Sequence, residues 1–274
     1  GLNDTPPTLG TLGNAFVAVA PDTLSLYFPS MVVGTLSGQT TAGDNVAIGL
    51  NSDVSGHSSI CIGELASSNG SNTVCIGAGA TGNNNNSVAI GHDASAISNR
   101  SVTIGFGATG GGSSVVIGDN ASSTGTDTIC IGTDGSANNN RSVAIGNNVQ
   151  TVSNDGIAIG NGASAGMMSV AIGSSASGNS DDNVVLGRSS SSATHNNCVV
   201  IGCDSTSAGG TAVIIGNSCT GSNNSVVMGA NADNSSGQSA VCIGTSSFAV
   251  REGVAIGPGA RAPGSTVPSA KPMA

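Results

Sequence analysis

A short aliphatic segment that ends in glycine recurs along most of the chain. Its form is Val-Ala-Ile-Gly with variants, and sixteen copies follow one another at steps of 13 to 15 residues, most often 14. A few β-branched residues bounded by turn formers are typical of a strand. A unit this short cannot bury a core by itself, so we predict an all-β parallel roll, or solenoid, of about 14 residues per turn. The copies close at Gly49, Gly63, Gly77, Gly91, Gly105, Gly118, Gly132, Gly146, Gly160, Gly173, Gly187, Gly202, Gly216, Gly229, Gly244 and Gly257.

The second half of each unit is weaker in pattern but consistent with the same coil. A small residue often stands three positions after the glycine, as at Ala66, Ala80 and Ala94, and Asn, Ser, Gly and Asp fill the segments between. Those residues favour turns. All eight prolines lie before residue 30 or after residue 257. Because proline cannot donate to a β-ladder, this placement supports a continuous ladder between those positions.

Alternation within the strand assigns its side chains to two faces. In Val-Ala-Ile the outer two residues share one face and the middle residue takes the other. The outer positions are nearly always Val, Ile, Leu or Met, so we predict that they fill the inside of the roll. Representative core residues are Val46, Ile48, Val88, Ile90, Val143, Ile145, Val254 and Ile256.

The middle position should then face outward, yet it is apolar or a thiol in fifteen of sixteen copies. A strand that is apolar on both faces is buried on both. We therefore predict self-association through this position, with a number of chains that the pattern itself does not give. The predicted interface residues are Ala47, Cys61, Cys75, Ala89, Thr103, Val116, Cys130, Ala144, Ala158, Ala171, Val185, Val200, Ile214, Val227, Cys242 and Ala255.

Ser-Val-Ala-Ile-Gly followed by x-x-Ala-x-Ala-x-Gly resembles the YadA-like head of trimeric autotransporter adhesins. The segments 91–96 and 160–166 match this pattern well, and the resemblance covers roughly residues 30 to 260. It implies a left-handed parallel β-roll, three chains around an axis, and surface adhesion. Similar heads occur in phage and viral fibres. Neither a heptad-repeat stalk nor a membrane anchor follows in this sequence, so we expect an excised head or a relative with another role.

Three regions are predicted. Residues 1–29 form an N-terminal cap over the first open turn or a docking segment, with Phe16, Tyr27 and Phe28 as its aromatic residues. Residues 30–257 form the repeats, and residues 258–274 form a proline-rich tail.

Composition and charge exclude several functions. The net charge is −9 and only 8% of residues are charged, with five scattered arginines and one lysine. A nucleic-acid surface needs clustered basic residues, so we predict no nucleic-acid partner. No apolar run approaches the roughly 18 residues of a membrane helix, so we predict no membrane span.

Candidate catalytic or ligand-binding patterns are weak. The matches to Gly-x-Gly-x-x-Gly at 77–82 and 105–110 lack the helix that a dinucleotide site requires. His57, His92 and His195 fall in separate repeats, and the seven cysteines lack the Cys-x-x-Cys spacing of zinc sites. We therefore predict no enzyme activity, no cofactor and no metal site.

Two functions remain open. One is a trimeric adhesion rod that binds a host receptor, glycan or matrix at the bacterial cell surface. The other is a viral structural protein, either a fibre or a minor capsid component, whose ends bind other virion proteins. The cysteines favour the virion, because free thiols persist in a reducing compartment. An ice-binding solenoid would need Thr-x-Thr in register, and Thr126–Thr128 is isolated.

Overall fold

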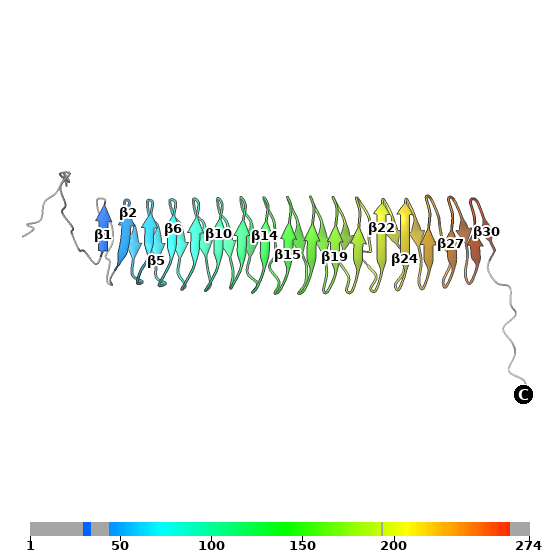
Figure 1. Ribbon diagram of the computed structural model, residues 1–274, viewed down its shortest axis with the longest axis horizontal. Coiled ribbons are helices and arrows are strands. Elements are labelled where there is room, and N and C mark those ends of the chain that lie inside the picture. The colour runs from blue at the N-terminus through cyan, green and yellow to red at the C-terminus, as the bar shows by residue number, and fades with distance from the viewer. Residues whose placement is uncertain (1–29, 34–43, 193, 264–274) are drawn as a thin grey trace, which may run out of the picture.

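The computed structural model describes residues 30–33, 44–192 and 194–263, and these residues form a straight β-solenoid (Figure 1). One wall is a sheet of 17 strands, in which each strand pairs in parallel with the equivalent strand of the next coil. The predicted all-β parallel solenoid of about 14 residues per turn is thereby confirmed. The strands of this wide sheet are β1 (Ser30–Val33), β2 (Asn45–Ile48), β4 (Ile60–Ile62), β6 (Val74–Ile76), β8 (Val88–Ile90), β10 (Val102–Ile104), β12 (Val115–Ile117), β14 (Ile129–Ile131), β15 (Val143–Ile145), β17 (Ile157–Ile159), β19 (Val170–Ile172), β21 (Val184–Leu186), β22 (Val199–Cys203), β24 (Val213–Asn217), β26 (Val226–Met228), β27 (Val241–Ile243) and β29 (Val254–Ile256).

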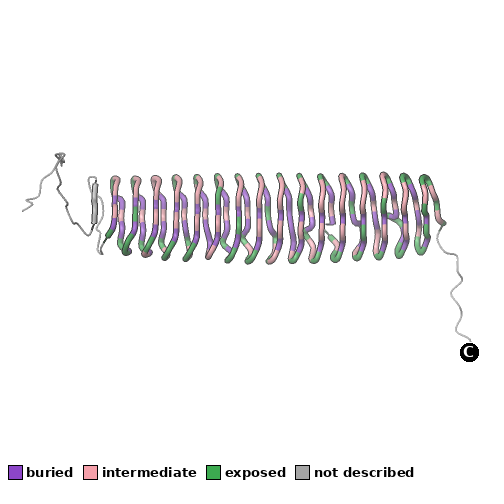
Figure 2. Tube along the Cα trace, in the orientation of Figure 1, coloured by how far each residue is buried: buried purple, intermediate pink, exposed green. Residues whose placement is uncertain are grey.

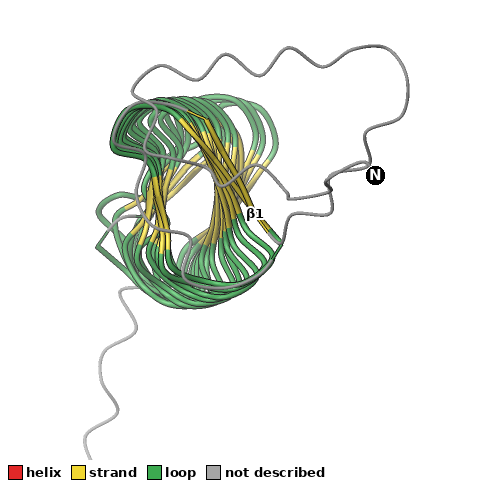
Figure 3. Cartoon of the chain, turned by 90° about the vertical axis from the view of Figure 1, so that its left-hand side faces the viewer, coloured by secondary structure: helices red, strands yellow, loops and turns green. Residues whose placement is uncertain are grey.

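The facing wall is built from strands of two residues, and the end view shows it across the coil from the wide sheet that contains β1 (Figure 3). They form sheets of six, three, two and two strands, and isolated parallel bridges at Ser136, Ser191 and Asp233 connect one sheet to the next. The last of these strands lies past residue 257, so the coil continues beyond the predicted end of the repeats. The short strands are β3 (Asp53–Val54), β5 (Ser67–Ser68), β7 (Thr81–Gly82), β9 (Ser95–Ala96), β11 (Thr109–Gly110), β13 (Ser122–Ser123), β16 (Gln150–Thr151), β18 (Ser164–Ala165), β20 (Ser177–Gly178), β23 (Thr206–Ser207), β25 (Thr220–Gly221), β28 (Phe248–Ala249) and β30 (Arg261–Ala262).

Two corners per coil hold the chain in the left-handed backbone region. In one coil these residues are Asn86 (φ 58°) and Asp93 (φ 54°), and the same positions recur along the rod. Asn and Asp tolerate this conformation better than other side chains, which accounts for their abundance in the turns.

The repeat glycine has a different constraint. Gly160 has a φ of 133°, and a Cβ atom there would lie 2.5 Å from the carbonyl oxygen of Gly173 in the next coil. Only glycine adopts this backbone without strain, and only glycine lets the coils stack this closely.

The interior of the coil is narrow and is filled by small side chains. From β2 to β29 the middle residue of the Val-Ala-Ile segment is buried inside the coil, and so is the small residue three positions after the glycine. Figure 2 shows buried positions recurring in every coil. Where a large residue enters this space, glycine faces it, since a Cβ atom at Gly221 would lie 2.7 Å from Ile214. The residue before most of the wide strands is polar and is also buried, and one of these residues, Ser114, donates a hydrogen bond to the Gly111 carbonyl at 2.6 Å.

Candidate self-association surface

In the wide strands β2 to β29, the two residues that flank the buried middle residue point outward, and all of them are aliphatic. Most are half-buried in the single chain, and others are exposed, for example Ile172 with 38% of its surface accessible. We call the two rows from β2 to β29 the aliphatic face. Its members are Val46, Ile48, Ile60, Ile62, Val74, Ile76, Val88, Ile90, Val102, Ile104, Val115, Ile117, Ile129, Ile131, Val143, Ile145, Ile157, Ile159, Val170, Ile172, Val184, Leu186, Val199, Ile201, Val213, Ile215, Val226, Met228, Val241, Ile243, Val254 and Ile256.

Strict register makes the aliphatic face continuous. Val46 pairs with Ile60 and Ile48 with Ile62, and the same correspondence runs strand by strand to Val254 and Ile256. At about 4.8 Å between strands and about 7 Å between rows, the face is about 70 Å long with an area on the order of 500 Å². Soluble monomers rarely expose apolar patches above a few hundred Å². A stable interface buries about 800 Å² per partner, so the face alone supplies more than half of that area.

The end of the rod shows how much of each aliphatic pair the neighbouring coil covers. Val254 and Ile256 lie on the last wide strand, and they are 62% and 66% exposed. Pairs within the rod, such as Val170 and Ile172, keep a smaller exposed fraction because the next coil lies against one side of them. Stacking of coils therefore covers the edges of these side chains and leaves their outward ends accessible.

The structure reverses the sequence-based assignment of the two strand faces. Residues predicted at the interface between chains, including Ala47, Cys61 and Val200, have no exposed surface and lie inside their own coil. Residues predicted in the roll core, including Val88 and Ile90, lie on the aliphatic face. The physical reason is the cross-section of the coil, which admits Ala, Cys and Val but has no room for two rows of larger side chains.

All sixteen predicted interface residues are buried inside the coil. They are Ala47, Cys61, Cys75, Ala89, Thr103, Val116, Cys130, Ala144, Ala158, Ala171, Val185, Val200, Ile214, Val227, Cys242 and Ala255. All eight predicted core residues point outward, namely Val46, Ile48, Val88, Ile90, Val143, Ile145, Val254 and Ile256. The predicted cap residues Phe16, Tyr27 and Phe28 lie outside the described part of the chain.

The opposite wall presents hydroxyl groups outward. The first residue of each short strand is stacked in register on its equivalent in the next coil, and eleven of twelve successive residues are Ser or Thr. We call this row the hydroxyl face. Aligning the sequence four residues after each repeat glycine reveals it, although the strand pattern does not. Its members are Ser67, Thr81, Ser95, Thr109, Ser122, Ser136, Gln150, Ser164, Ser177, Ser191, Thr206 and Thr220.

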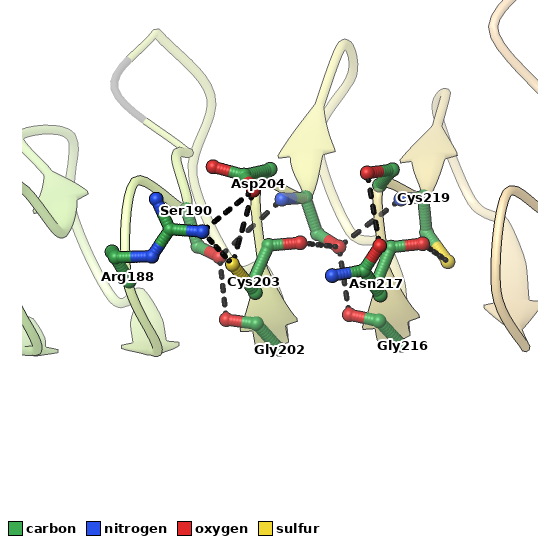
Figure 4. A network of polar contacts seen from close by, with 10 residues as sticks. Arg188, Ser190, Gly202, Cys203, Asp204, Gly216, Asn217 and Cys219 are labelled. Carbon is green, nitrogen blue, oxygen red and sulfur yellow. Dashed lines mark hydrogen bonds and ion pairs between the residues drawn. The ribbon is translucent and has the colours of Figure 1, made fainter.

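A polar network joins three coils near residues 188–219 (Figure 4). Arg188 donates hydrogen bonds to the Cys203 sulfur at 2.8 Å and to an Asp204 oxygen at 3.1 Å. The hydrogen bond of Cys203 to Asp204 raises the pKa of the Cys203 thiol. Beneath this surface contact, Ser190 donates to the Gly202 carbonyl at 2.8 Å, which ties one coil to the next.

The histidines stay on separate coils, as their spacing predicts. The His92 ring stacks on Phe106 with centroids 5.2 Å apart and lies 3.0 Å from the exposed carboxylate of Asp93. Within the described residues, no group of three or more His, Cys, Asp or Glu side chains is placed to hold a metal ion. The glycine-rich segment 77–82 spans a corner and the short strand β7, and strand β8 follows it.

No protein-family model matches this chain, and a search of the curated proteins found no match. The part of the chain that the structure describes contains no helix that is long and apolar enough to span a membrane.

Proposed function

We propose that the chain is a non-enzymatic structural protein that assembles into a homotrimeric rod for surface adhesion or receptor binding. The aliphatic face carries this proposal, because its two rows continue without a polar residue over sixteen strands. The left-handed sense of the coil and the number three come from the resemblance to YadA-like heads. In the trimer, three aliphatic faces lie against one another around the axis.

Burial of the aliphatic face supplies the driving force for assembly. Removing apolar surface from water contributes roughly 25 cal/mol per Å². Each chain offers an area on the order of 500 Å², and association costs on the order of 4–15 kcal/mol in lost motional freedom. The gain from two or three such faces exceeds that cost. Because the chains are identical, a closed ring of subunits covers every copy of the face.

The hydroxyl face supports the adhesive part of the proposal. It lies on the wall opposite the aliphatic face, so trimer formation leaves it outward and accessible. Eleven of its twelve coils repeat a hydroxyl group at the same position, about 4.8 Å from the next coil. A surface that repeats weak contacts along three chains binds by avidity, which raises the overall affinity by a factor of about 10²–10⁴ over that of a single contact. A glycan, a receptor or a matrix protein is the kind of partner that such a surface fits.

Adhesion can be tested on coated beads. Beads carrying the native chain are offered to host cells, matrix proteins and a glycan panel, beside beads carrying the variant Val170→Glu/Ile172→Glu. That variant keeps the hydroxyl face intact and places charges on the aliphatic face. We expect the native beads to adhere and the variant to bind about 100-fold more weakly through loss of avidity. Equal retention of both kinds of bead, or no retention on any surface, would contradict the proposal.

A second candidate function is a virion fibre or minor capsid component. The observation in its favour is that five of the seven cysteines have no cysteine as their cross-strand partner in the adjacent coil. Such thiols persist in a reducing compartment, where many viruses assemble. Mass spectrometry of purified virions and of bacterial outer-membrane fractions separates the two candidates, since each predicts the chain in one fraction only.

A further inference from the structure

Two buried cysteines are stacked on each other in the wall of the wide sheet. Cys61 of β4 and Cys75 of β6 are directly paired in the parallel register. Both belong to the middle column, so both thiols point into the coil, and neither has any exposed surface. The column therefore brings two thiols together across adjacent coils.

Other cysteines of the same column lack such a partner. Cys130 pairs with Val116 on one side and with Ala144 on the other. Cys242 pairs with Val227 and Ala255. Cys130 and Cys242 are therefore single thiols in the same buried column, with which the Cys61–Cys75 pair can be compared.

The two paired thiols differ from each other in acidity. Burial raises the pKa of Cys130. The pKa of Cys75 is instead lowered, first by the hydrogen bond from the Cys61 thiol and further by Thr73 and the Gly82 backbone. The same hydrogen bond raises the pKa of Cys61. Since the thiolate is the reactive form, we expect Cys75 to act as the nucleophile of the pair and Cys61 as its resolving partner.

We propose that Cys61 and Cys75 are a modification site, oxidised to a disulfide between adjacent coils by a small-molecule disulfide such as glutathione disulfide. The Cys75 thiolate attacks the oxidant, forms a mixed disulfide and releases one glutathione thiolate. The Cys61 thiol loses its proton and attacks the Cys75 sulfur, which releases the second glutathione. Two protein thiols and one glutathione disulfide thus become one protein disulfide and two glutathione molecules, with no other reactant.

The ladder geometry is compatible with this bond. Neighbouring parallel strands lie about 4.8 Å apart, within the Cα separation of about 4.4–6.8 Å that disulfides adopt. The bond would close a loop of one coil and prevent these coils from separating. Because both thiols are buried, the oxidant reaches them before the coils close or when they open locally.

A cleavage site lies between the two cysteines and gives a direct test. Glu64 and Glu252 are the only glutamates in the chain, and Cys61 is the only cysteine before Glu64. The protein is refolded with glutathione disulfide, alkylated, denatured and cut after glutamate without reductant. We expect fragment 1–64 to stay joined to fragment 65–252 and to separate when dithiothreitol is added.

Alanine variants provide matched controls that should fold, because Ala47 and Ala89 occupy the same column in the adjacent coils. In Cys75→Ala fragment 1–64 should be released without reductant, and in Cys130→Ala it should stay joined as in the native chain. Release of the fragment from the oxidised native chain would overturn the proposal. Retention of the fragment in Cys75→Ala to the native extent would also overturn it, because Cys61 would then have another partner.

Discussion

The two walls of the coil carry different side chains on their outward faces but similar side chains on their inward faces. The interior of both walls is lined with small, buried side chains. Outside, the hydroxyl face carries Ser and Thr at all but one position, whereas the aliphatic face carries only Val, Ile, Leu and Met. A solenoid that worked as a single chain would need hydroxyl or charged residues on both walls. This difference is the basis of the proposed assembly, in which one wall meets water and the other meets protein.

The largest expected effect comes from placing charge on each face in turn. Val170→Glu/Ile172→Glu puts two carboxylates per chain into the proposed interface, where burial of unpaired charge is strongly unfavourable. Ser177→Glu/Asn179→Glu puts the same charge on the opposite wall of the same coil. We expect the first variant to be monomeric by light scattering and the second to keep the native mass. Identical masses for the two variants would show that the faces do not differ as proposed.

Replacing two neighbouring isoleucines of one strand by alanine distinguishes a side chain that is buried within its own chain from one that partner chains would bury. Ile214 is fully buried in the coil and faces Gly221, so Ile214→Ala should lower the free energy of unfolding by about 2–5 kcal/mol. Ile215 is on the aliphatic face, and Ile215→Ala should cost less than about 1 kcal/mol in the monomeric Val170→Glu/Ile172→Glu background.

In the native background the cost of Ile215→Ala should rise, because partner chains cover that side chain. Denaturant unfolding of each variant in both backgrounds measures the difference. If Ile215→Ala lowers the free energy of unfolding equally in the two backgrounds, no partner chain covers the aliphatic face.

A smaller effect is expected at the corner that connects the two walls. Gly160→Ala forces a side chain into a φ of 133° and against the Gly173 carbonyl, and should cost about 1–3 kcal/mol. Gly162 is the matched control, because its φ of 64° suits Asn and the nearest atom to an added Cβ is 3.8 Å away. Gly162→Asn should therefore unfold at nearly the native temperature. Equal melting shifts would mean that coil stacking does not depend on the repeat glycine.

The smallest effect concerns an exposed ion pair on the polar surface. Arg141 donates to Asp155 in the next coil at 2.6 and 2.8 Å, and this hydrogen bond lowers the pKa of Asp155. In Arg141→Gln the pKa of Asp155 should rise toward its ordinary value, as a carboxyl NMR titration would show. A carboxyl group whose pKa is lower in the folded than in the unfolded chain stabilises the fold at pH values above its unfolded-state pKa. This stabilisation is lost as the pH falls through the folded-state pKa. The variant should thus be slightly less stable than the native chain at neutral pH and equal to it in acid.

Much of the fold could be predicted from the sequence, because the repeat and its turn residues are local signals. The closing glycines, the parallel coils and the Asn and Asp corners all follow from the 14-residue period. The alternation of residues along the strand also correctly assigned Val88 and Ile90 to one face and Ala89 to the other. It could not say which side is inside, because that depends on the width enclosed by the facing wall. Only the structure shows that the coil has room for Ala89 and not for its neighbours.

The surface chemistry was predictable in part. The hydroxyl face appears once the repeats are aligned on their glycines, since residues such as Ser67 and Thr81 occupy one position of the period. The contact of Arg188 with Cys203 and Asp204 could not be found in this way. The step from Gly187 to Gly202 is 15 residues, and the direction of a long arginine side chain across that step is set by the three-dimensional path of the corner.

The mass of the intact chain in solution tests the central claim most directly. Multi-angle light scattering of the purified protein should give three times the 26.0 kDa of one chain, in a single species that persists on dilution. A stable, soluble species of 26.0 kDa would mean that the aliphatic face remains in water, and the account of a trimeric rod would then be wrong.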